Sequence, residues 1–284
     1  MKSLISQERK SFHRYLTDNG VLTIENNIAS NADKSSKLSK GIAQKMAELL
    51  GASERTKAEG QTIGATFESA CRDFLNNTFL KLQNLRPGKW HVDKLGNRNS
   101  IKTSSFVQYE HLDYLEQLIK DDSQLATCIG NDYIVAPDII IYRNPEPDEF
   151  INADSLIVDD NCSRLTAMRE AFNKLPILHA SISAKWTMRS DRAQNSRTEA
   201  LGLIRNRKGH LPHIVVITGE PLPSRLASLA LGTGDIDCLY HIALYELIEA
   251  VKATRAEDSI EMLNILISGK RLKDISDLPL DLSV

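Results

Sequence analysis

Cysteine is scarce in this chain of 284 residues, and long apolar runs are missing. The four cysteines, Cys71, Cys128, Cys162 and Cys238, form no CxxC pair, which argues against a zinc knuckle or a redox dithiol and favours a reducing, cytoplasmic setting. The longest apolar stretches are a few residues long, too short to cross a bilayer, and the first residues lack the apolar segment of a secretory signal. We therefore expect no association with a membrane.

Motifs for nucleotide and zinc chemistry are missing as well. The seven histidines form no HxH or HExxH pattern, no P-loop occurs, and Gly232-Thr233-Gly234 lacks the third glycine of a dinucleotide fingerprint. The 35 basic and 37 acidic residues give a formal net charge of -2. A polyanionic partner therefore needs a local basic patch, because the chain as a whole has no basic excess.

The order of the apolar patterns predicts an α/β fold. Strands that alternate with helices are typical of a central, at least partly parallel sheet flanked by helices. The sequence contains no internal repeat and no clear linker, so we expect one domain over residues 1–284. Runs rich in Ile and Val predict buried strands over 133–142, 177–187 and 214–218, and helical spacing predicts helices over 66–85, 105–120, 193–206, 222–230 and 240–252.

Two polar stretches are predicted to form surface loops. Residues 26–40 are rich in Ser, Asn and Asp and lie between a short helix near residues 12–16 and structure that resumes at Ile42. Residues 144–160 contain two prolines and many acidic side chains. We expect this second stretch to be an acidic surface region.

One carboxylate lies in an apolar segment. Asp138 follows Pro137 and is flanked by Ile and Val on both sides, and a buried, unpaired charge costs several kcal/mol. On the strand predicted over 177–187, side-chain alternation places Ser183 and Lys185 on one face. If the two strands are neighbours, Asp138, Ser183 and Lys185 converge, either as an ion pair that closes a sheet edge or as a catalytic centre.

Two glutamates each lie at the border of the apolar face of a predicted helix. Glu68 can pair with Arg72 one turn later, and Glu199 can simply be solvated. Taken with Asp138 and Lys185, however, they supply the hard oxygen ligands that Mg²⁺ prefers. Both interpretations remain open at this point.

A basic patch begins at Lys185. From Lys185 to His210 seven Lys or Arg stand against two acids, a local charge of +5. Inside it lies Arg189-Ser190-Asp191-Arg192. Arginine presents a fork that matches guanine O6 and N7, and a carboxylate accepts from cytosine N4. Two copies of this tetrapeptide related by a dyad therefore have the groups needed to recognise CCGG, although such tetrapeptides also occur as surface ion-pair clusters.

Together these features make the chain resemble a type II restriction endonuclease of the PD-(D/E)xK superfamily, in the branch that recognises CCGG-containing sites. The resemblance covers nearly the full length and includes blocks outside the catalytic motif. It implies a restriction-endonuclease-like α/β fold with a central mixed β-sheet flanked by helices. The matching segments are PDII at 137, LHASIS from 178, RSDRAQN from 189, ALGTG from 230 and GKRLKDISDLPLDL near the C-terminus.

The resemblance also implies a magnesium nuclease with two Mg²⁺ ions per active site. Asp138 and Lys185 would be its central residues, and Ser183 stands where many relatives have Glu. The missing acid would be replaced by Glu68 and Glu199 from neighbouring helices. The implied metal ligands are Asp138, Glu68, Glu199 and the backbone carbonyl of Ala184.

For DNA, the resemblance implies that Arg189, Asp191 and Arg192 recognise the CCGG core. The expected site is GCCGGC, cut after the first G to leave a 5′-CCGG overhang. The expected assembly is a homotetramer made of two dimers, and a cognate DNA methyltransferase would protect the host DNA. Four residues match positions that contact the outer base pair or the groove: Asp33, Ser35, Gln61 and Arg225.

Two other functions are compatible with parts of the pattern. A catalytically silent, sequence-specific DNA-binding protein would keep the recognition residues but would not need Asp138, Lys185, Glu68 and Glu199 together. A structure-directed repair nuclease would cut without requiring CCGG. Cleavage of defined DNA distinguishes all three.

Overall fold

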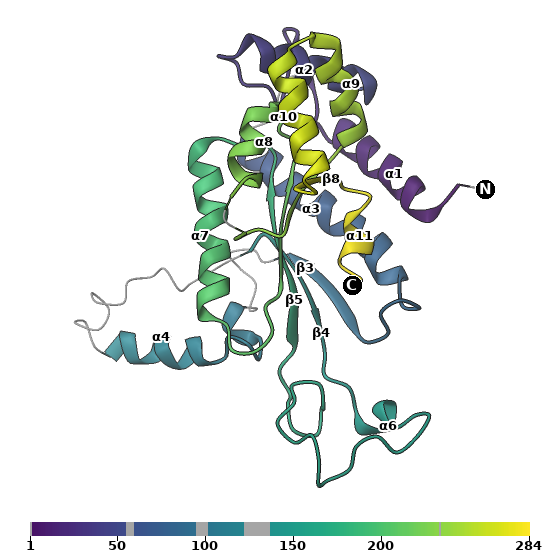
Figure 1. Ribbon diagram of the computed structural model, residues 1–284, viewed down its shortest axis with the longest axis vertical. Coiled ribbons are helices and arrows are strands. Elements are labelled where there is room, and N and C mark those ends of the chain that lie inside the picture. Colours follow the sequence, from purple (N-terminus) through teal and green to yellow (C-terminus); the bar gives the residue numbers. More distant parts are fainter. Residues whose placement is uncertain (1, 55–59, 95–101, 122–136, 233) are drawn as a thin grey trace.

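A computed structural model describes residues 2–54, 60–94, 102–121, 137–232 and 234–284 (Figure 1). At residues 60, 61, 121 and 190–192 the backbone is described and the side chains are not.

The described part of the chain is built around a mixed sheet of six strands in the order β3-β4-β5-β6-β7-β8. β4 pairs antiparallel with both β3 and β5, whereas β5, β6, β7 and β8 run parallel. The predicted central mixed sheet is therefore confirmed. The strands are β3 (Trp90–Lys94), β4 (Ile139–Arg143), β5 (Ile177–Lys185), β6 (His213–Thr218), β7 (Cys238–His241) and β8 (Leu272–Asp274), and β1 (Ile24–Glu25) and β2 (Ile28–Ala29) form a separate small hairpin.

Helices cover both faces of this sheet. α3 (Gly60–Thr78) packs against β3 and β5 and carries α1 (Leu4–Asp18) on its outer side, while α7 (Ser190–Asn206) lies on the opposite side of the sheet (Figure 1). The other helical segments are α2 (Lys37–Leu49), α4 (His111–Asp121), α6 (Asp148–Ile151), α8 (Pro223–Ala230), α9 (Leu244–Thr254), α10 (Glu257–Ser268), α11 (Leu278–Asp281) and the short 3-10 turns Phe79–Lys81 and Thr103–Ser105.

The core follows from the composition of the central strands. β4 begins with three Ile residues, and β6 contains the run Ile-Val-Val-Ile. The side chains of both runs are buried on both faces of the sheet. Continuous apolar runs of this kind are typical of strands with helices on both sides. On the α3 face, the rings of Phe67 and Trp186 meet edge-on with centroids 5.2 Å apart, a favourable aromatic geometry. This contact fixes α3 against the end of β5.

The structure corrects several sequence predictions. Residues 26–40 are not simply an exposed loop, because Ser30 and Asn31 are buried and α2 already begins at Lys37. The helix predicted over 240–252 begins at Leu244, because the residues before it belong to β7. The helix predicted over 105–120 begins at His111. Part of the strand predicted over 133–142 lies outside the described residues, and its described part is β4.

A long connection between β4 and β5, residues 144–176, extends away from the sheet (Figure 1). We call it the arm. The buried guanidinium of Arg169 braces it by donating to the Asp148 carboxylate and to the carbonyls of Asp159 and Cys162. At its surface the arm exposes several large apolar side chains: Phe150, Leu156, Ile157, Leu165 and Phe172.

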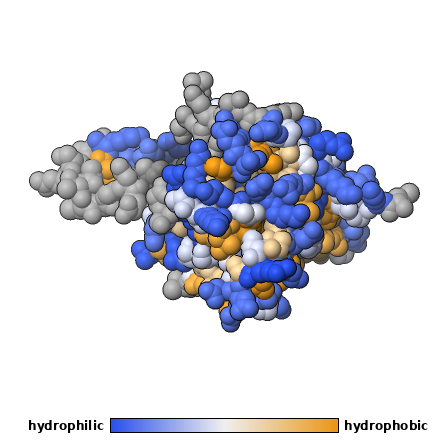
Figure 2. Space-filling view, turned by 90° about the horizontal axis from the view of Figure 1, so that it is seen from above, coloured by the Kyte–Doolittle hydropathy of each residue, from blue (hydrophilic) through white to orange (hydrophobic). Residues whose placement is uncertain are grey.

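The end of the molecule formed by α2, α9 and α10, opposite the arm, has a different surface. Seen from above, this face is mostly hydrophilic, with apolar residues scattered among the polar ones (Figure 2). Among the described helices, none is long and apolar enough to span a membrane.

Three buried histidines predict a loss of stability in mild acid. Burial lowers the pKa of His13, lowers that of His179 to about 3 and lowers that of His241 to about 4. A depressed folded pKa gives stability that is present above pH 6.5 and is lost as the pH falls toward the folded value. Between pH 6.5 and pH 5 the unfolded chain binds a proton at His179 and at His241 that the folded chain does not. We expect each of these two histidines to lower the free energy of unfolding by about 2 kcal/mol over this range.

Urea denaturation at a series of pH values measures this loss. His179→Gln is expected to make the dependence on pH less steep, since an amide does not titrate in this range. His210→Gln is the matched control, because His210 is exposed. An unchanged slope in the His179 variant would contradict the prediction.

Candidate active site and nucleic-acid interface

Asp138, Ser183 and Lys185, which the sequence predicts to converge, lie at one edge of the sheet. Because β4 is antiparallel to β5, with Ile139 opposite Ile182, the residue before β4 lies beside the last residues of β5. β6 is parallel to β5 and ends level with it, with Lys185 opposite Thr218. The start of β4, the end of β5 and the end of β6 therefore form a common edge.

Asp138 and Lys185 are in direct contact at this edge. The Nζ atom of Lys185 lies 2.8 Å from Oδ2 of Asp138, and the backbone N–H of Ala184 donates to the same oxygen at 2.8 Å. The two side chains are only 18 and 19% exposed. The predicted convergence of Asp138 with Lys185 is therefore confirmed, and the pair remains partly accessible to water.

Ser183 and Glu199 lie on the α7 side of this pair. The Ser183 hydroxyl is 3.2 Å from the Ser196 hydroxyl and 3.5 Å from Oε2 of Glu199. Burial raises the pKa of Glu199, Lys185 lowers it, and the negative charge of Asp138 raises it further. Glu199 is thus a half-buried carboxylate that is repelled by a second one, not a solvated helix residue.

Glu68 approaches from α3 on the other face of the sheet. Its carboxylate pairs with Lys94 of β3 at 2.8 Å, whereas Arg72 instead donates to Asp73. Burial raises the pKa of the Cys71 thiol, and the charges of Asp138 and Glu68 raise it further. Lys94 did not emerge from the sequence, because a lysine at the end of a short strand has no distinguishing pattern.

The donors at this edge fit a hard divalent cation by their chemistry. Asp138 and Glu199 lie near the end of β5, and the repulsion between them is of the kind that a cation relieves. Among the described residues, no three His, Cys, Asp or Glu side chains lie close enough together to hold a metal as they stand. Lys185, Lys94 and the hydroxyl of Ser183 contact these carboxylates instead.

The tetrapeptide at 189–192 lies just beyond this edge. Arg189 is the exposed N-cap residue of α7, and the remaining three residues form its first turn. Met188, immediately before them, is buried. The side chains of Asp191 and Arg192, and that of Gln61 near the start of α3, lie outside the described side chains. The backbone nevertheless carries the tetrapeptide directly from the end of β5.

A second polar cluster joins distant parts of the chain beside the tetrapeptide. The Arg225 guanidinium of α8 pairs with the Asp33 carboxylate, whose other oxygen accepts from the Ser35 hydroxyl at 2.7 Å. The hydrogen bonds from Ser35 and the charge of Arg225 hold the pKa of Asp33 below its usual range. The predicted residue Asp33 is therefore in contact with both Ser35 and Arg225, which were predicted with it.

Sequence reasoning missed Glu220, which lies next to this cluster. Its side chain is fully buried, and burial raises its pKa to about 7. The signal available was a glutamate between Gly219 and Pro221, directly after a buried strand. That pattern is also typical of an ordinary polar turn.

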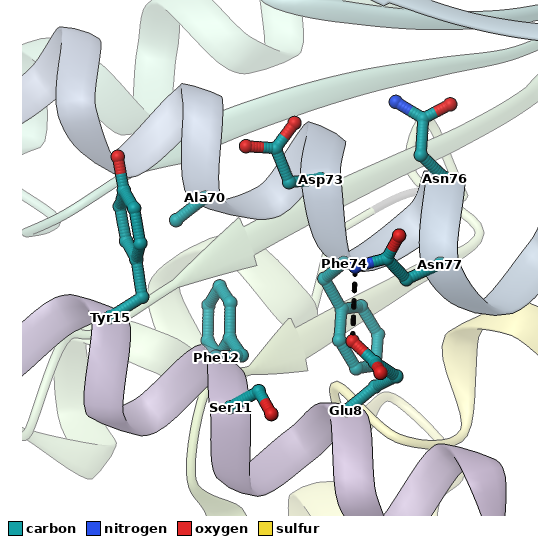
Figure 3. Close-up of a pocket in the computed structure, with 9 residues that line it drawn as sticks. All are labelled: Glu8, Ser11, Phe12, Tyr15, Ala70, Asp73, Phe74, Asn76 and Asn77. Carbon is teal, nitrogen blue, oxygen red and sulfur yellow. Dashed lines mark hydrogen bonds between the residues drawn. The ribbon is translucent and has the colours of Figure 1, made fainter.

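A separate groove of about 330 Å³ lies between α1 and α3 (Figure 3). Phe12 and Phe74 form its floor, and Asn77 of α3 donates to the Glu8 carboxylate of α1 at 3.1 Å across it. None of the proposed catalytic or DNA-contacting residues lines this groove. It belongs to the packing of the two helices and not to the sheet edge.

Comparison with known proteins identifies the class. The family described as NgoMIV restriction enzyme matches residues 12–284. The chain is 49% identical to the type II restriction enzyme NgoMIV of Neisseria gonorrhoeae over 288 residues, which cover 100% of both chains. A carboxylate–lysine pair at the edge of a mixed sheet is thus accompanied by full-length similarity to a restriction enzyme, and the chain is a type II restriction endonuclease. It belongs to the NgoMIV restriction enzyme family.

Solved structures give a looser likeness. The type IIF restriction endonuclease Bse634I, crystallised with cognate DNA, is 14% identical with a TM-score of 0.40, covering 86% of this chain and 91% of its own. The restriction endonuclease PspGI, in complex with substrate DNA, is 13% identical with a TM-score of 0.29, covering 99% of this chain and 92% of its own.

Proposed function

We propose that this endonuclease hydrolyses double-stranded DNA at GCCGGC, cutting after the first G and leaving a 5′-CCGG overhang with a 5′ phosphate. The proposal depends chiefly on the contact between Asp138 and Lys185 at the sheet edge, in a chain 49% identical over its full length to a type II restriction enzyme. We also propose that residues 1–284 form one catalytic domain and that the enzyme acts in the cytoplasm.

The contacts of Lys185 support a role for it on the scissile phosphate. Its ammonium is held by Asp138 and still reaches solvent, so it can orient an attacking water or neutralise charge that develops on the phosphate. Ser183, which lies within hydrogen-bonding distance of Glu199, stands where many relatives have a glutamate. The missing negative charge would then come from Glu68 on α3 and Glu199 on α7.

Two Mg²⁺ ions per active site are proposed, held by Asp138, Glu199, Glu68 and the Ala184 carbonyl. Bound Mg²⁺ supplies Lewis acidity that activates water and stabilises the leaving oxygen. For Glu68 to serve as a ligand, its carboxylate has to exchange Lys94 for the cation. Asp138 can keep its hydrogen bond from the Ala184 N–H, because a carboxylate has a second oxygen available.

The proposed specificity follows from the elements at the same edge. Arg189 and Arg192 each present a fork to one guanine, and Asp191 accepts from the cytosines of the opposite strand. Asp33, Ser35, Gln61 and Arg225 are proposed to contact the outer base pair or the groove. The ion pair of Arg225 with Asp33 supports this assignment, since it places two of these residues together.

Digestion of a fully sequenced DNA with Mg²⁺, followed by sequencing of the cut ends, tests the proposal. Fragments ending at G/CCGGC are the expected result. Cuts at other CCGG contexts would overturn the roles of Asp33 and Arg225, and cuts unrelated to CCGG would indicate a structure-directed nuclease. Binding of a GCCGGC duplex without cleavage by any divalent metal would indicate a silent binder.

We further propose a homotetramer of two dimers, in which the arm supplies a contact between chains. Its apolar side chains support this, since Leu156 and Leu165 are 81 and 102% exposed. The arm also lies away from the sheet edge, so a contact there leaves that edge open to DNA (Figure 1). A cognate methyltransferase that protects GCCGGC in the host is proposed as the functional partner.

The double variant Leu156→Glu, Leu165→Glu is expected to halve the molecular mass in solution while its far-ultraviolet circular dichroism stays unchanged. Both side chains are solvent-exposed in the single chain, so only an intermolecular contact can be lost. Light scattering after size exclusion measures the mass. Leu85→Glu, at a 55% exposed leucine outside the arm, is the matched control and is expected to keep the full mass. An unchanged mass in the double variant would remove the arm from the proposal.

A further inference from the structure

Glu220 makes two hydrogen bonds from a completely buried position. Its Oε2 accepts from the backbone N–H of Met188 at 2.8 Å, and its Oε1 accepts from the backbone N–H of Leu222 at 3.1 Å. Met188 immediately precedes the tetrapeptide 189–192, and Leu222 is the N-cap residue of α8, which carries Arg225. One carboxylate therefore joins the segments that lead into α7 and α8, the two helices that carry proposed DNA-contacting residues.

The same carboxylate extends this connection to a third segment. Nη1 of Arg225 lies 3.8 Å from Oε2 of Glu220, while the other end of the guanidinium pairs with Asp33. Beside it the buried Asn31 donates to the Gly219 carbonyl at 2.7 Å. The loop containing Asp33 and Ser35 is thus fixed to the turn that holds Glu220, although the two are far apart in the sequence.

The turn approaches the end of β5 closely. The Gly219 N–H donates to the Trp186 carbonyl at 3.2 Å, and a Cβ added at Gly219 would lie 2.8 Å from the Trp186 ring. This leaves little space for the turn to move relative to residues 186–188. The position of Glu220 relative to the tetrapeptide is therefore set by packing as well as by hydrogen bonds.

We propose that Glu220 is a positioning residue that holds the tetrapeptide for the CCGG core and the Asp33–Arg225 pair for the outer base pair in one fixed arrangement. The inference rests on the proposed recognition roles of those residues. The chemistry requires a carboxylate, because two N–H donors and a guanidinium need two acceptor oxygens and a negative charge. Glutamine has one acceptor oxygen and no charge, so Glu220→Gln loses one of the two hydrogen bonds and the attraction to Arg225.

The experiment measures how well the full-length protein distinguishes three labelled duplexes without divalent metal, so that binding is seen apart from cleavage. The duplexes contain GCCGGC, ACCGGT with a changed outer pair, and GCATGC with a changed core. Mismatched base pairs typically weaken binding by roughly five- to hundredfold. We expect Glu220→Gln to reduce both the outer-pair and the core preference by at least about fivefold.

Asp274→Asn is the matched control. Asp274 is also a fully buried carboxylate that binds an arginine and a backbone N–H, here Arg9 and Leu244, but it lies apart from the recognition residues. We expect the control to lose melting temperature and keep both preferences. A role of Glu220 in stability alone would give the same pattern as the control.

The outcomes separate the inference from the proposed function. No preference for GCCGGC in the unmodified protein would refute the proposed specificity whatever Glu220 does. Preference in the unmodified protein that persists undiminished in Glu220→Gln would overturn the inference. If Glu220→Gln is not recovered folded, Gly219→Ala shifts the same turn against Trp186 and is expected to reduce both preferences, and unchanged preferences there would overturn the inference as well.

Discussion

Asp138→Asn and Lys185→Ala are each expected to lower the rate of DNA cleavage by at least about a thousandfold, because general acid–base groups and metal ligands contribute factors of this size. Asparagine keeps an oxygen that can accept from the Ala184 N–H, and the ion pair is partly exposed. The partner left behind by either substitution still reaches solvent, so its charge can be hydrated. Folding should therefore be largely spared.

Single-turnover cleavage of a GCCGGC duplex gives the rate, and thermal melting checks the fold. Lys273→Ala is the matched control, since Lys273 forms a similar partly exposed pair with Asp281 at 2.6 Å in another part of the molecule. We expect it to cut at close to the unmodified rate. An Asp138 variant that still cuts would refute the assignment of this sheet edge as the catalytic site.

Arg9→Met is expected to lower the free energy of unfolding by about 3–5 kcal/mol, the typical cost of breaking a buried ion pair from one side. Arg9 of α1 donates to both carboxylate oxygens of Glu246 and to both of Asp274, at 2.6 to 2.9 Å. Asp274 is completely buried. Without Arg9 its charge lacks a compensating cation, and α1 loses its connection to α9 and β8.

Urea denaturation at pH 7 gives the change in unfolding free energy. Lys45→Met, which removes an exposed pair with Glu48 on α2, is the control and is expected to cost less than about 1 kcal/mol. A loss that small in Arg9→Met would show that the four hydrogen bonds contribute little net stability. The carboxylates would then have to be satisfied by water.

The catalytic pair could be predicted from the sequence because its signal is local. Asp138 interrupts an apolar run, and Ser183 and Lys185 alternate along a strand, so only the adjacency of the two strands had to be assumed. β4 and β6 were found because each contains a run of Ile or Val, and β5 shows the alternation of Leu178, Ala180, Ile182 and Ala184 with polar side chains. The register between β4 and β5 then brings Asp138 to Lys185.

Other parts of the site depend on contacts that no local pattern encodes. The pairing of Glu68 with Lys94 requires β3, a short strand whose apolar alternation covers only Trp90 and Val92. Asn31 lies in a polar stretch that suggests a surface loop, yet it is buried because its partner is the Gly219 carbonyl. Polar residues in such stretches are predicted to be exposed unless a distant partner is known.

The placement of the acids on two helices has a consequence for how the enzyme is made. Glu68 lies on α3, before the central strands, and Glu199 lies on α7, after β5, on the other side of the sheet. A chain still emerging from the ribosome lacks the second acid until residue 199 has been synthesised, and it lacks Arg225 for longer. Because the proposed site takes groups from both sides of the sheet, a chain that ends before residue 199 lacks one of its proposed acids.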